Sequence, residues 1–547
     1  MPKRDELVFL PLGGSGEIGM NFNAYGFGPA NRRQWIVVDC GITFGNESQT
    51  PGVDIIMPDI RFLAEHRDQV LGIIATHAHE DHIGAIAPLW PMLKCPIFAT
   101  PFTARLIEGK LAEAGISAPV RDVPVGGSLT LGPFAIDFIS ITHSILEPNL
   151  LAIRTPLGVI AHTGDWKIDP DPVLGEVTDT AAIQKLGDDG VLALVCDSTN
   201  ALVPGHSGSE AAVRDSLSIL VGGLKGRVAV TAFASNVARL DSIARAAAAN
   251  GRKVALVGRS MHKIVGAARE SGYLIDLPAM LDPAEAADLP ARKVLYLVTG
   301  SQGEPRAALG RIADGNHRDV QLGKGDAVIF SSRVIPGNDL PIFELHNKLS
   351  ALGVEVLTAE DHFVHVSGHP AREELSQMYR WTRPRIAVPV HGELRHMAEH
   401  ARLAKSLQVP EALVPANGQL YRLAPGPAEL IDEVPSGRIH MDGRVLVAEG
   451  EGLAKARRAM AFAGLIAITL VLDEKGRLAA EAGILTEGMP KPVEGAVRIA
   501  VDETLRRHNP KKSDSDELRE TVRRAARRAA QEAWGKKPVT RVTVIEL

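Results

Sequence analysis

The sequence predicts a multidomain α/β protein, and three features of the chain support this prediction. Its 547 residues exceed what one hydrophobic core ordinarily holds and suit two to four domains. Short aliphatic runs recur through about the first 200 residues, and similar runs alternate with alanine-rich segments between about 207 and 360. Apolar residues make up 45% of the chain and charged residues 23%, the balance of a folded globular protein.

The first strands are predicted where aliphatic runs end abruptly in a polar residue. These runs are LVFLPL, WIVVDCG, LGIIATH, FAIDFISITH, GVIAHTGD and LALVCDS. A helix is expected among them at residues 104–114. We expect strands of this kind to deliver functional side chains from their ends.

An inserted parallel α/β module is predicted at residues 207–360. RVAVTAFAS, KVALVGR, VLYLVTGSQ and DAVIFSSR are typical of buried strands, and residues 236–249 of an intervening helix. The first pattern returns in RIAVPVHGE, and residues 423–430 (LAPGPAEL) are predicted as a linker or connecting turn. The last segment combines strand-like runs at 465–472 and 539–547 with two helical stretches.

Several classes of protein are excluded by composition. The longest nearly apolar run, residues 460–472, is shorter than the roughly 20 residues of a membrane-spanning helix, and the N-terminus lacks a signal-peptide pattern. The three cysteines, Cys40, Cys95 and Cys196, cannot build a disulfide framework. We therefore expect a cytoplasmic protein that does not associate with membranes.

Basic residues collect toward the C-terminal end. Residues 451–547 hold 19 Lys and Arg against 14 Asp and Glu, although the whole chain has a net charge of −5. The i,i+4 spacing within this segment places four arginines on one helical face: Arg523, Arg524, Arg527 and Arg528. Such a face can contact nucleic-acid phosphates, but a solvated or subunit-contacting face is the preferred interpretation.

A glycine pattern near the N-terminus imitates a dinucleotide site. Gly14, Gly16 and Gly19 spell GxGxxG, and Asp39 lies downstream at the end of WIVVD. A dinucleotide site needs a helix directly after the glycines, whereas MNFNAYGFGPANRR favours a strand and a turn. No dinucleotide is therefore expected.

One short segment has the composition of a metal site. His77-Ala78-His79-Glu80-Asp81-His82 follows the apolar run LGIIAT. Burying so many imidazoles and carboxylates is costly without a cation, and first-row divalent metals prefer such ligands. We predict that His77 and His79 face one metal ion, and that Asp81 and His82 face a second.

Further potential ligands stand at the ends of later strands. His143 ends ISITH, Asp165 follows VIAHTG, and His391 follows AVPV. Each predicted ion then has three ligands of its own, with Asp165 bridging: His77, His79 and His143 for the first, and Asp81, His82 and His391 for the second. Two cations about 3.5–4 Å apart generate hydroxide near neutral pH and hold both reacting oxygens of a phosphoryl transfer.

Asp39 is predicted to support this site without binding metal. It terminates a strand-like run, as the proposed ligands do. Metal-binding histidines ordinarily donate their second ring N–H to such a carboxylate. We therefore expect Asp39 to orient one of the ligand histidines.

The HxHxDH pattern with later histidine and aspartate strand ends resembles the metallo-β-lactamase superfamily. The long stretch between Asp165 and His391 is similar to the insert of the β-CASP nucleases in that superfamily. Asp197 in CDSTN, His369 in HVSGHP and His391 in PVHGE match their additional motifs. LGGSGEIGMN, TAFASN, TGSQGEP, SSRVIPGN and HVSGHPAREEL resemble the ribonuclease J family over residues 7–445.

This resemblance implies the domain order. Residues 1–206 and 361–450 would form a metallo-β-lactamase αββα sandwich, residues 207–360 a β-CASP α/β domain, and residues 451–547 a small α+β domain for oligomerisation and RNA contact. A homodimer or homotetramer is expected.

The resemblance also implies an activity. It predicts a two-metal ribonuclease with two Zn²⁺ per chain, or Mn²⁺ in their place. Such an enzyme would cleave single-stranded RNA from 5′-monophosphate ends and internally, leave 5′-phosphates, and act in RNA decay and ribosomal RNA maturation. Two alternatives stay open: a small-ester or thioester hydrolase of glyoxalase II type, and a catalytically silent RNA-binding subunit.

Residues beyond the ligand set receive roles from the same resemblance. Asp81, Asp197 and His369 are expected to take part in the catalytic step. The segment expected to bind the RNA backbone is His365, Val366, Ser367, Gly368 and His369. Pro370 is expected at the first position of the next helix, whose free N–H groups would add to a phosphate pocket.

Two weaker expectations concern residues elsewhere. Ser235 and Asn236 resemble residues that bind a 5′-terminal phosphate, although an ordinary helix cap is an equally good interpretation. Gly52, Asp54 and Asp442 resemble a structural Ca²⁺ site of some relatives.

Overall fold

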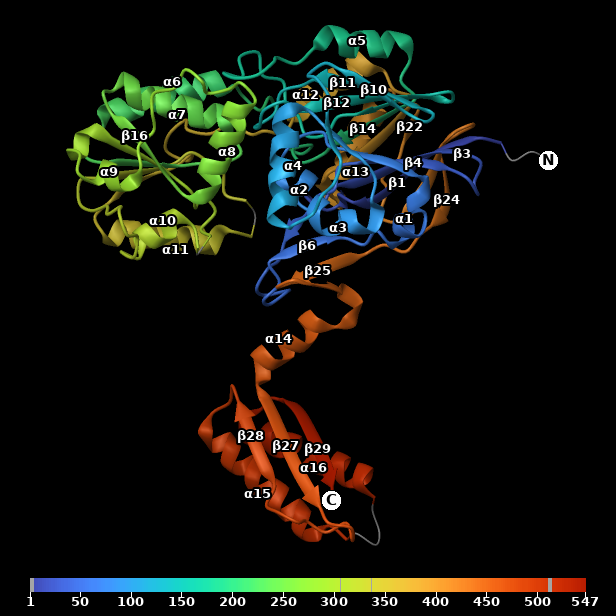
Figure 1. The fold of residues 1–547 in the computed structure, drawn as a ribbon, viewed down its shortest axis with the longest axis vertical. Helices are drawn as coiled ribbons and strands as arrows, with labels where there is room; N and C mark the ends of the chain where they lie inside the picture. The colour runs from blue at the N-terminus through green and yellow to red at the C-terminus, as the bar shows by residue number, and fades with distance from the viewer. Residues whose placement is uncertain (1–3, 305, 336, 510–513) are drawn as a thin grey trace. The chain divides into compact units, whose positions relative to one another are not determined.

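The computed structural model describes residues 4–304, 306–335, 337–509 and 514–547. It divides into two compact units, each built from two stretches of chain (Figure 1): Met1–Thr43 with Met57–Gly437, and Phe44–Ile56 with Arg438–Leu547. The inserted α/β module therefore belongs to the first unit, and residues 438–450 join the second. Pro305 and Pro336, in two of the family-like motifs, lie outside the described residues. Among the described helices, none combines the length and apolar character of a membrane span.

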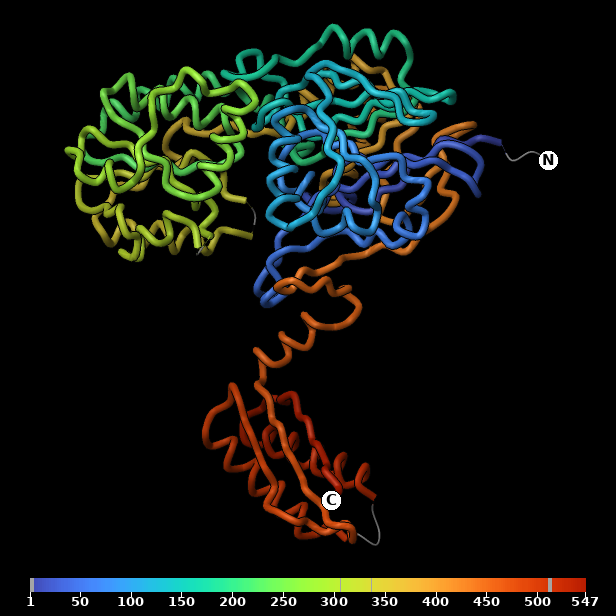
Figure 2. Tube along the Cα trace, viewed as in Figure 1, coloured from blue at the N-terminus to red at the C-terminus, as the bar shows by residue number. Residues whose placement is uncertain are grey.

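A sandwich of two β-sheets forms most of the first unit, and Figure 2 traces the chain through it. The eight-stranded sheet has the order β24 (Glu429–Glu433), β23 (Gln419–Ala424), β1 (Glu6–Gly13), β3 (Phe22–Gly28), β4 (Gln34–Val38), β7 (Val70–Ile74), β8 (Ile97–Ala99) and β9 (Val120–Asp122). The seven-stranded sheet has the order β10 (Ser128–Leu131), β11 (Phe134–Ser140), β12 (Asn149–Thr155), β13 (Gly158–His162), β14 (Ala193–Asp197), β20 (Ile386–Val390) and β22 (Glu411–Ala412). Strands β13, β14 and β20 are parallel, so their carboxyl ends share one edge.

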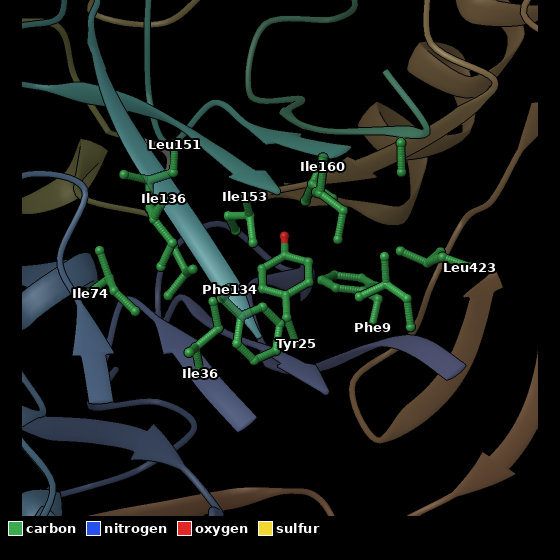
Figure 3. Packing of buried hydrophobic residues seen from close by; sticks show 14 of the residues in the cluster. Phe9, Tyr25, Ile36, Ile74, Phe134, Ile136, Leu151, Ile153, Ile160 and Leu423 are labelled. Carbon is green, nitrogen blue, oxygen red and sulfur yellow. The ribbon is translucent and has the colours of Figure 1, made fainter. Parts of the chain in front are cut away.

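The hydrophobic core lies between the two sheets (Figure 3). In β11, buried Phe134, Ile136 and Phe138 alternate with the more exposed Ala135 and Asp137, the pattern of a strand with one buried face. Core side chains come from both sheets: Phe9, Tyr25, Ile36 and Ile74 from the first, and Phe134, Ile136, Leu151, Ile153 and Ile160 from the second. This packing holds the strand ends in fixed positions.

Helices complete the sandwich. A second apolar cluster joins the seven-stranded sheet to α5 (Thr180–Asp189), α12 (Arg372–Thr382) and α13 (Leu394–Ser406) through Ile183, Leu375 and Leu403. The helices that connect strands of the other sheet are α1 (Arg61–Glu65), α2 (Glu80–Ile83), α3 (Ile86–Leu93) and α4 (Pro101–Glu113). The helix expected at 104–114 is α4.

The insert is a parallel α/β module, as the alternating pattern predicts. Its five strands have the order β16 (Lys253–Val257), β17 (Val294–Val298), β15 (Val228–Thr231), β18 (Ala327–Phe330) and β19 (Glu355–Leu357). Its helices are α6 (Glu210–Gly223), α7 (Val237–Ala249), α8 (Arg259–Glu270), α9 (Pro283–Ala287), α10 (Ala308–Ala313) and α11 (Asp339–Ala351). Helices α6 and α7 lie on one side of the sheet, and α10 and α11 on the other (Figure 1).

Strands of the second unit lie in two sheets. A four-stranded sheet has the order β26 (Val445–Ala448), β25 (Arg438–Asp442), β6 (Ile55–Pro58) and β5 (Thr43–Phe44). Helix α14 (Leu453–Ala463) leads to a three-stranded sheet of β28 (Gly483–Glu487), β27 (Leu465–Leu472) and β29 (Val539–Glu546). Helices α15 (Lys491–Arg507) and α16 (Ser515–Trp534) pack on this sheet through buried valines and alanines.

One of two local expectations is confirmed and the other is corrected. Of the linker or connecting turn predicted at residues 423–430, the structure has the turn, a hairpin between the paired strands β23 and β24. Pro370 precedes helix α12, which begins at Arg372 after Ala371. The N–H of Ala371 donates to the Glu374 carboxylate at 2.7 Å, so this N–H is not free to bind a phosphate.

Candidate metal centre

The predicted ligands meet at the carboxyl ends of neighbouring strands. The turn that carries His77 and His79 follows β7, and His82 lies in the short helix α2. His143 follows β11, Asp165 follows β13, and His391 follows β20. The predicted ligand atoms form two groups that share Asp165: His77, His79, His143 and Asp165, and Asp81, His82, Asp165 and His391. A third group shares the same aspartate and consists of Asp165, Asp197, His369 and His391. Within each group all ligand atoms lie within 4.8 Å of one another.

The first group is dominated by imidazoles. Nδ1 of His79 lies 3.1 Å from Nε2 of His77 and 3.1 Å from Nε2 of His143. Oδ2 of Asp165 lies 4.0 Å from the His77 nitrogen and 3.8 Å from that of His143. Three nitrogens and one oxygen therefore surround a common point, which is the donor set that zinc and similar divalent metals prefer.

The second group carries more negative charge. Oδ2 of Asp165 lies 3.2 Å from Nε2 of His82 and 3.5 Å from Nε2 of His391. Oδ2 of Asp81 lies 3.7 Å from each of the same two nitrogens. Asp165 thus belongs equally to both groups, as a bridging carboxylate must.

Hydrogen bonds from the opposite ring nitrogen fix the orientation of these histidines. Nδ1 of His82 donates to Oδ2 of Asp39 at 2.7 Å, and Nδ1 of His143 donates to the Gly368 carbonyl at 2.5 Å. Nδ1 of His391 donates to Oδ1 of Asn21 at 2.9 Å. For His143 and His391 this leaves Nε2 facing the shared centre, whereas Nε2 of His82 also lies 3.0 Å from Nδ2 of Asn21.

Asp39 occupies the supporting place that its strand end suggests. Its second oxygen accepts a bond from the Thr76 amide at 2.8 Å, and Oδ2 also accepts the Thr76 hydroxyl at 2.9 Å. The Thr76 oxygen lies 2.9 Å from Nδ1 of His77. One buried carboxylate therefore orients His82 directly and His77 through a hydroxyl.

The residues present fit a divalent cation. Nε2 of His391 and Oδ1 of Asp165 are buried and have no hydrogen-bond partner among the described residues, which is costly unless a ligand satisfies them. Burial lowers the pKa of His77 and His143 well below 6.5 and that of His79 to about 4, so these rings are neutral, as metal ligands must be. Burial opposes ionisation of Asp165, but His391 and His82 hold its pKa well below 3.8.

A glycine makes room for each histidine-rich segment. A Cβ atom on Gly41 would lie 1.7 Å from the Asp81 carbonyl. A Cβ atom on Gly368 would lie 2.6 Å from Oγ of Ser144 and 2.8 Å from the His143 ring. Both positions therefore require glycine for the backbone to approach the site closely.

The loop at residues 365–369, called here the HVSGH loop, lies beside the metal centre. Nδ1 of His369 lies 2.8 Å from Oδ2 of Asp197 and 3.8 Å from Oδ2 of Asp165. Nδ2 of Asn200 donates to Oγ of Ser367 at 2.8 Å and to the His369 carbonyl at 3.1 Å. Burial lowers the pKa of His369, but Asp197 and Asp165 outweigh it and raise the pKa to about 9.

The remaining members of the loop are more enclosed. Val366 is buried beside Gly208. A Cβ atom added to Gly208 would lie 2.7 Å from Cγ1 of Val366. Nδ1 of His365 is buried without a hydrogen-bond partner among the described residues. Burial first, and then the charge of Arg239, lowers the pKa of His365 to about 3.

Ser235 and Asn236 lie at the start of α7, in the insert. Oδ1 of Asn236 accepts the Arg239 amide at 3.0 Å, and its Nδ2 lies 3.3 Å from Oε1 of Glu210. The side chain of Asn236 is therefore a helix cap with both polar atoms engaged, and it is not free for a terminal phosphate. Ser235 is only half-buried.

Arginine takes the place expected for calcium in the second unit. Nη1 and Nη2 of Arg457 lie 3.1 and 2.7 Å from the two carboxylate oxygens of Asp442. Nη1 also points at the carbonyls of Pro51 and Gly52, at 3.3 and 3.4 Å. Because a guanidinium already neutralises Asp442 and uses the Gly52 oxygen, the Ca²⁺ prediction for Gly52, Asp54 and Asp442 is not supported.

Several residues of the site escaped the sequence-based prediction. Thr76 and Asn21 orient ligand histidines, and Asn200 holds the HVSGH loop. Thr76 directly precedes His77, and Asn21 follows the glycine pattern. Both residues therefore stand next to motifs from which a role in the site could have been predicted. That pattern leads into strand β3, and the Gly14 carbonyl accepts the His391 amide at 2.6 Å.

Family models match nearly the whole chain. The metallo-β-lactamase superfamily matches residues 24–220, and the ribonuclease J β-CASP domain matches residues 225–349. The RNA specificity domain of Zn-dependent metallo-hydrolases matches residues 353–414, and the ribonuclease J C-terminal domain matches residues 453–547. Fold and site together define a metal-dependent hydrolase of the metallo-β-lactamase fold with a β-CASP insert.

Full-length relatives narrow this class. Ribonuclease J of Sinorhizobium meliloti is 45% identical, over 100% of this chain and 98% of the relative. Ribonuclease J of Thermus thermophilus is 37% identical over 99% of this chain and 96% of its own length. The chain belongs to the ribonuclease J family, a family of metal-dependent RNA hydrolases, which confirms the predicted family and fold class.

A solved structure supports the fold alone. A protein of unknown function from Enterococcus faecalis aligns with a TM-score of 0.52 and 15% identity, covering 76% of this chain and 99% of that protein.

Proposed function

We propose that this chain is a two-ion ribonuclease that degrades single-stranded RNA from 5′-monophosphate ends and also cuts internally. The observation that carries the proposal is the pair of ligand groups joined at Asp165, with His369 and Asp197 directly beside them. Two Zn²⁺ per chain suit the imidazole-rich donors, and Mn²⁺ is the alternative for the more acidic group. Cytoplasmic RNA decay and ribosomal RNA maturation, by a homodimer or homotetramer, complete the proposal.

The two cations, when bound, supply an activated water and neutralise phosphate charge. His369 protonates the departing 3′ oxygen, so that the phosphate stays on the 5′ end of the downstream product. Asp197 holds Nδ1 of His369 and thereby orients its Nε2. Asp81, with 30% of its side chain exposed against 2% for Asp165, is the member of its group that meets solvent.

The HVSGH loop receives the RNA backbone in this proposal. Ser367 offers a hydroxyl, and the imidazoles of His365 and His369 offer N–H donors. The loop touches the metal group through the bond between the Gly368 carbonyl and His143. A phosphate bound on the loop would therefore lie next to the metal centre.

Three forms of one RNA test the end preference. The same single-stranded RNA is prepared with a 5′-monophosphate, a 5′-triphosphate or a 5′-hydroxyl, and its decay is followed by single-nucleotide products. We expect the monophosphate form to decay fastest, because a triphosphate adds bulk and further negative charge that a pocket shaped for one phosphate does not hold. Equal decay of all three forms would favour a mainly endonucleolytic enzyme.

Ser235→Ala tests one candidate for the terminal-phosphate pocket. A hydrogen bond to a charged acceptor is worth about 1.5–3 kcal/mol, so its loss should narrow the difference between 5′ ends while internal cleavage changes little. Asn236→Ala is unsuitable for this purpose, because it would remove a helix cap. An unchanged end preference in Ser235→Ala would exclude Ser235 from the pocket.

A further inference from the structure

Arg239, in helix α7 of the insert, is a buried guanidinium whose contacts lead to the HVSGH loop. It is 1% exposed. Its Nε and Nη2 each lie 2.9 Å from one carboxylate oxygen of Glu210, which is also 1% exposed. Its Nη1 donates to the Ser331 carbonyl at 2.9 Å, to Oγ of Ser331 at 2.8 Å and to the Val364 carbonyl at 3.0 Å.

Val364 is the residue directly before the loop. Its carbonyl accepts a second bond, from Oγ of Ser331, at 2.6 Å. Two donors from the insert therefore fix the peptide that joins Val364 to His365. Because Arg239 also bonds both oxygens of Glu210, the guanidinium has little freedom to move.

The far end of the loop is fixed by another buried charge. Glu374 is fully buried, and its carboxylate accepts the Ala371 amide at 2.7 Å. The same carboxylate accepts the Ser207 amide at 2.9 Å and the Ile168 amide at 2.8 Å. Ile168 lies three residues after Asp165. Glu374 therefore connects the end of the loop to the chain segment that carries the bridging carboxylate.

Stability alone does not account for the Arg239–Glu210 pair. Buried ion pairs are often no more stabilising than well-packed apolar residues of the same size. The planar guanidinium offers what an apolar residue cannot, several N–H groups in a fixed arrangement around chosen carbonyls. Here one of those carbonyls sits at the entrance of the loop.

We propose that Arg239, held by Glu210, is a positioning residue that sets the HVSGH loop for phosphate binding, so that the insert controls the geometry of the site. The inference rests on the proposed function, because it takes the loop as the part that receives the RNA backbone. Arg239 itself does not touch the substrate in this arrangement.

Two changes separate positioning from charge balance. Glu210→Gln with Arg239→Met removes both buried charges together, so neither is left unpaired. Ser331→Ala leaves the ion pair and the Arg239–Val364 bond in place and removes only the hydroxyl contacts. Arg252→Met is the matched control, since Arg252 is 5% exposed and donates to the carbonyls of Gly226 and Val294, away from the loop.

The readout is the sensitivity of each enzyme to one missing phosphate charge. A set of short RNAs is prepared in which each member carries one uncharged methylphosphonate, at a different linkage near the cleaved bond. The ribose at that linkage is 2′-O-methylated both in the modified RNA and in its control RNA. The ratio of kcat/KM for control and modified RNA measures how well that phosphate is held. Metal content and thermal midpoint are recorded for every variant.

We expect at least one linkage to show a large penalty in the unmodified enzyme. In the double variant and in Ser331→Ala the penalty should shrink, by about tenfold for loss of one or two hydrogen bonds, with metal content unchanged. Arg252→Met should lower the thermal midpoint and keep the full penalty. If the double variant fails to fold, Arg239→Lys takes its place, because lysine keeps the charge beside Glu210 but lacks the planar set of N–H groups that also reaches the Val364 carbonyl.

The possible failures are distinguishable. No penalty at any linkage in the unmodified enzyme would overturn the proposed role of the loop in the function. A clear penalty that persists undiminished in Ser331→Ala and in the folded double variant would overturn the inference about Arg239 and leave the proposed function standing.

Discussion

The two histidine-rich segments of the site, residues 77–82 and the HVSGH loop, are held in different ways. The first is fixed by backbone bonds to two other stretches of chain: the Cys40 amide, which follows β4, donates to the His82 carbonyl at 2.7 Å, and the Asn21 amide, which follows the glycine pattern, donates to the Asp81 carbonyl at 2.9 Å. The HVSGH loop is fixed by side chains distant in sequence. Its partners are Asn200, Asp197 and His143 in the sandwich and Arg239 and Ser331 in the insert.

This difference teaches which part of the site tolerates change. The 77–82 turn is held by main-chain bonds together with the side chains of Asp39 and Asn21, all close to the ligands, so mutations there should mainly affect metal binding. The loop depends on a few side chains in two parts of the first unit, so mutations around it should change catalysis while metal stays bound.

The largest effect is expected at the residue that both ligand groups share. Asp165→Ala removes the bridging carboxylate and leaves neighbouring imidazoles without their counter-charge. We expect loss of both ions and of RNA cleavage, with the circular dichroism spectrum retained, and His79→Ala should lose the first ion. Metal analysis and a labelled-RNA assay provide the measurement, and full cleavage by chelator-treated enzyme would contradict the two-ion proposal.

His369→Ala tests the loop side of the comparison. Loss of an acid–base group should lower turnover by about 10²–10⁴-fold, because the departing oxygen then leaves without a proton. Metal content should stay near normal, since Nδ1 of His369 is held by Asp197 and His369 belongs to neither of the two groups assigned to the ions, although it forms a third group with Asp165, Asp197 and His391. Parallel loss of metal and activity would show that His369 is itself a ligand.

Asp39→Asn tests the support beneath the 77–82 turn. Asp39 has a positive φ of 66°, which asparagine tolerates, but an amide has one acceptor oxygen for the bonds from His82 and Thr76. We expect metal affinity to fall by about 10–100-fold, measured by chelator competition. Asp241→Asn, at a buried carboxylate paired with Arg245, is the control that should leave metal affinity unchanged.

The smallest effect concerns the strand end that carries Asp197. His400 is buried between the hydroxyls of Ser198 and Tyr379, at 2.9 Å from each, and burial lowers its pKa to about 4. The free energy that this neutral ring contributes is fully present above pH 6.5 and is lost as the pH falls toward 4, because the unfolded chain takes up the proton first.

Removing the His400 ring should make the free energy of unfolding depend less steeply on pH at acidic pH. His400→Gln is expected to reduce the slope of unfolding free energy by up to about 1.4 kcal/mol per pH unit between those limits. Urea unfolding at several pH values measures it. His262→Gln, at an exposed position, should leave the slope as it is, and equal slopes in all three proteins would contradict the assignment.

Sequence patterns found the elements that carry the site. The runs ending at His77, His143, Asp197 and His391 are the strand ends of two sheets, because short buried strands with polar ends depend on local patterning. The helix expected at 236–249 is α7, displaced by one residue at its start. The start of α12 was predicted wrongly, because Pro370 precedes it by two residues. For Asn236, the helix cap was one of two equal interpretations, and its side chain caps α7.

The sequence by itself determined the donor chemistry: which residue types stand at which strand ends, and hence the class of metal and of reaction. The tertiary structure alone decided which nitrogen each histidine presents, that Arg457 neutralises Asp442, and that Arg239 holds the peptide before His365. The physical reason is how far apart along the chain the interacting residues are. Strand patterns follow from neighbouring residues, whereas the orientation of a buried polar group depends on hydrogen-bond partners that only packing brings within 3 Å.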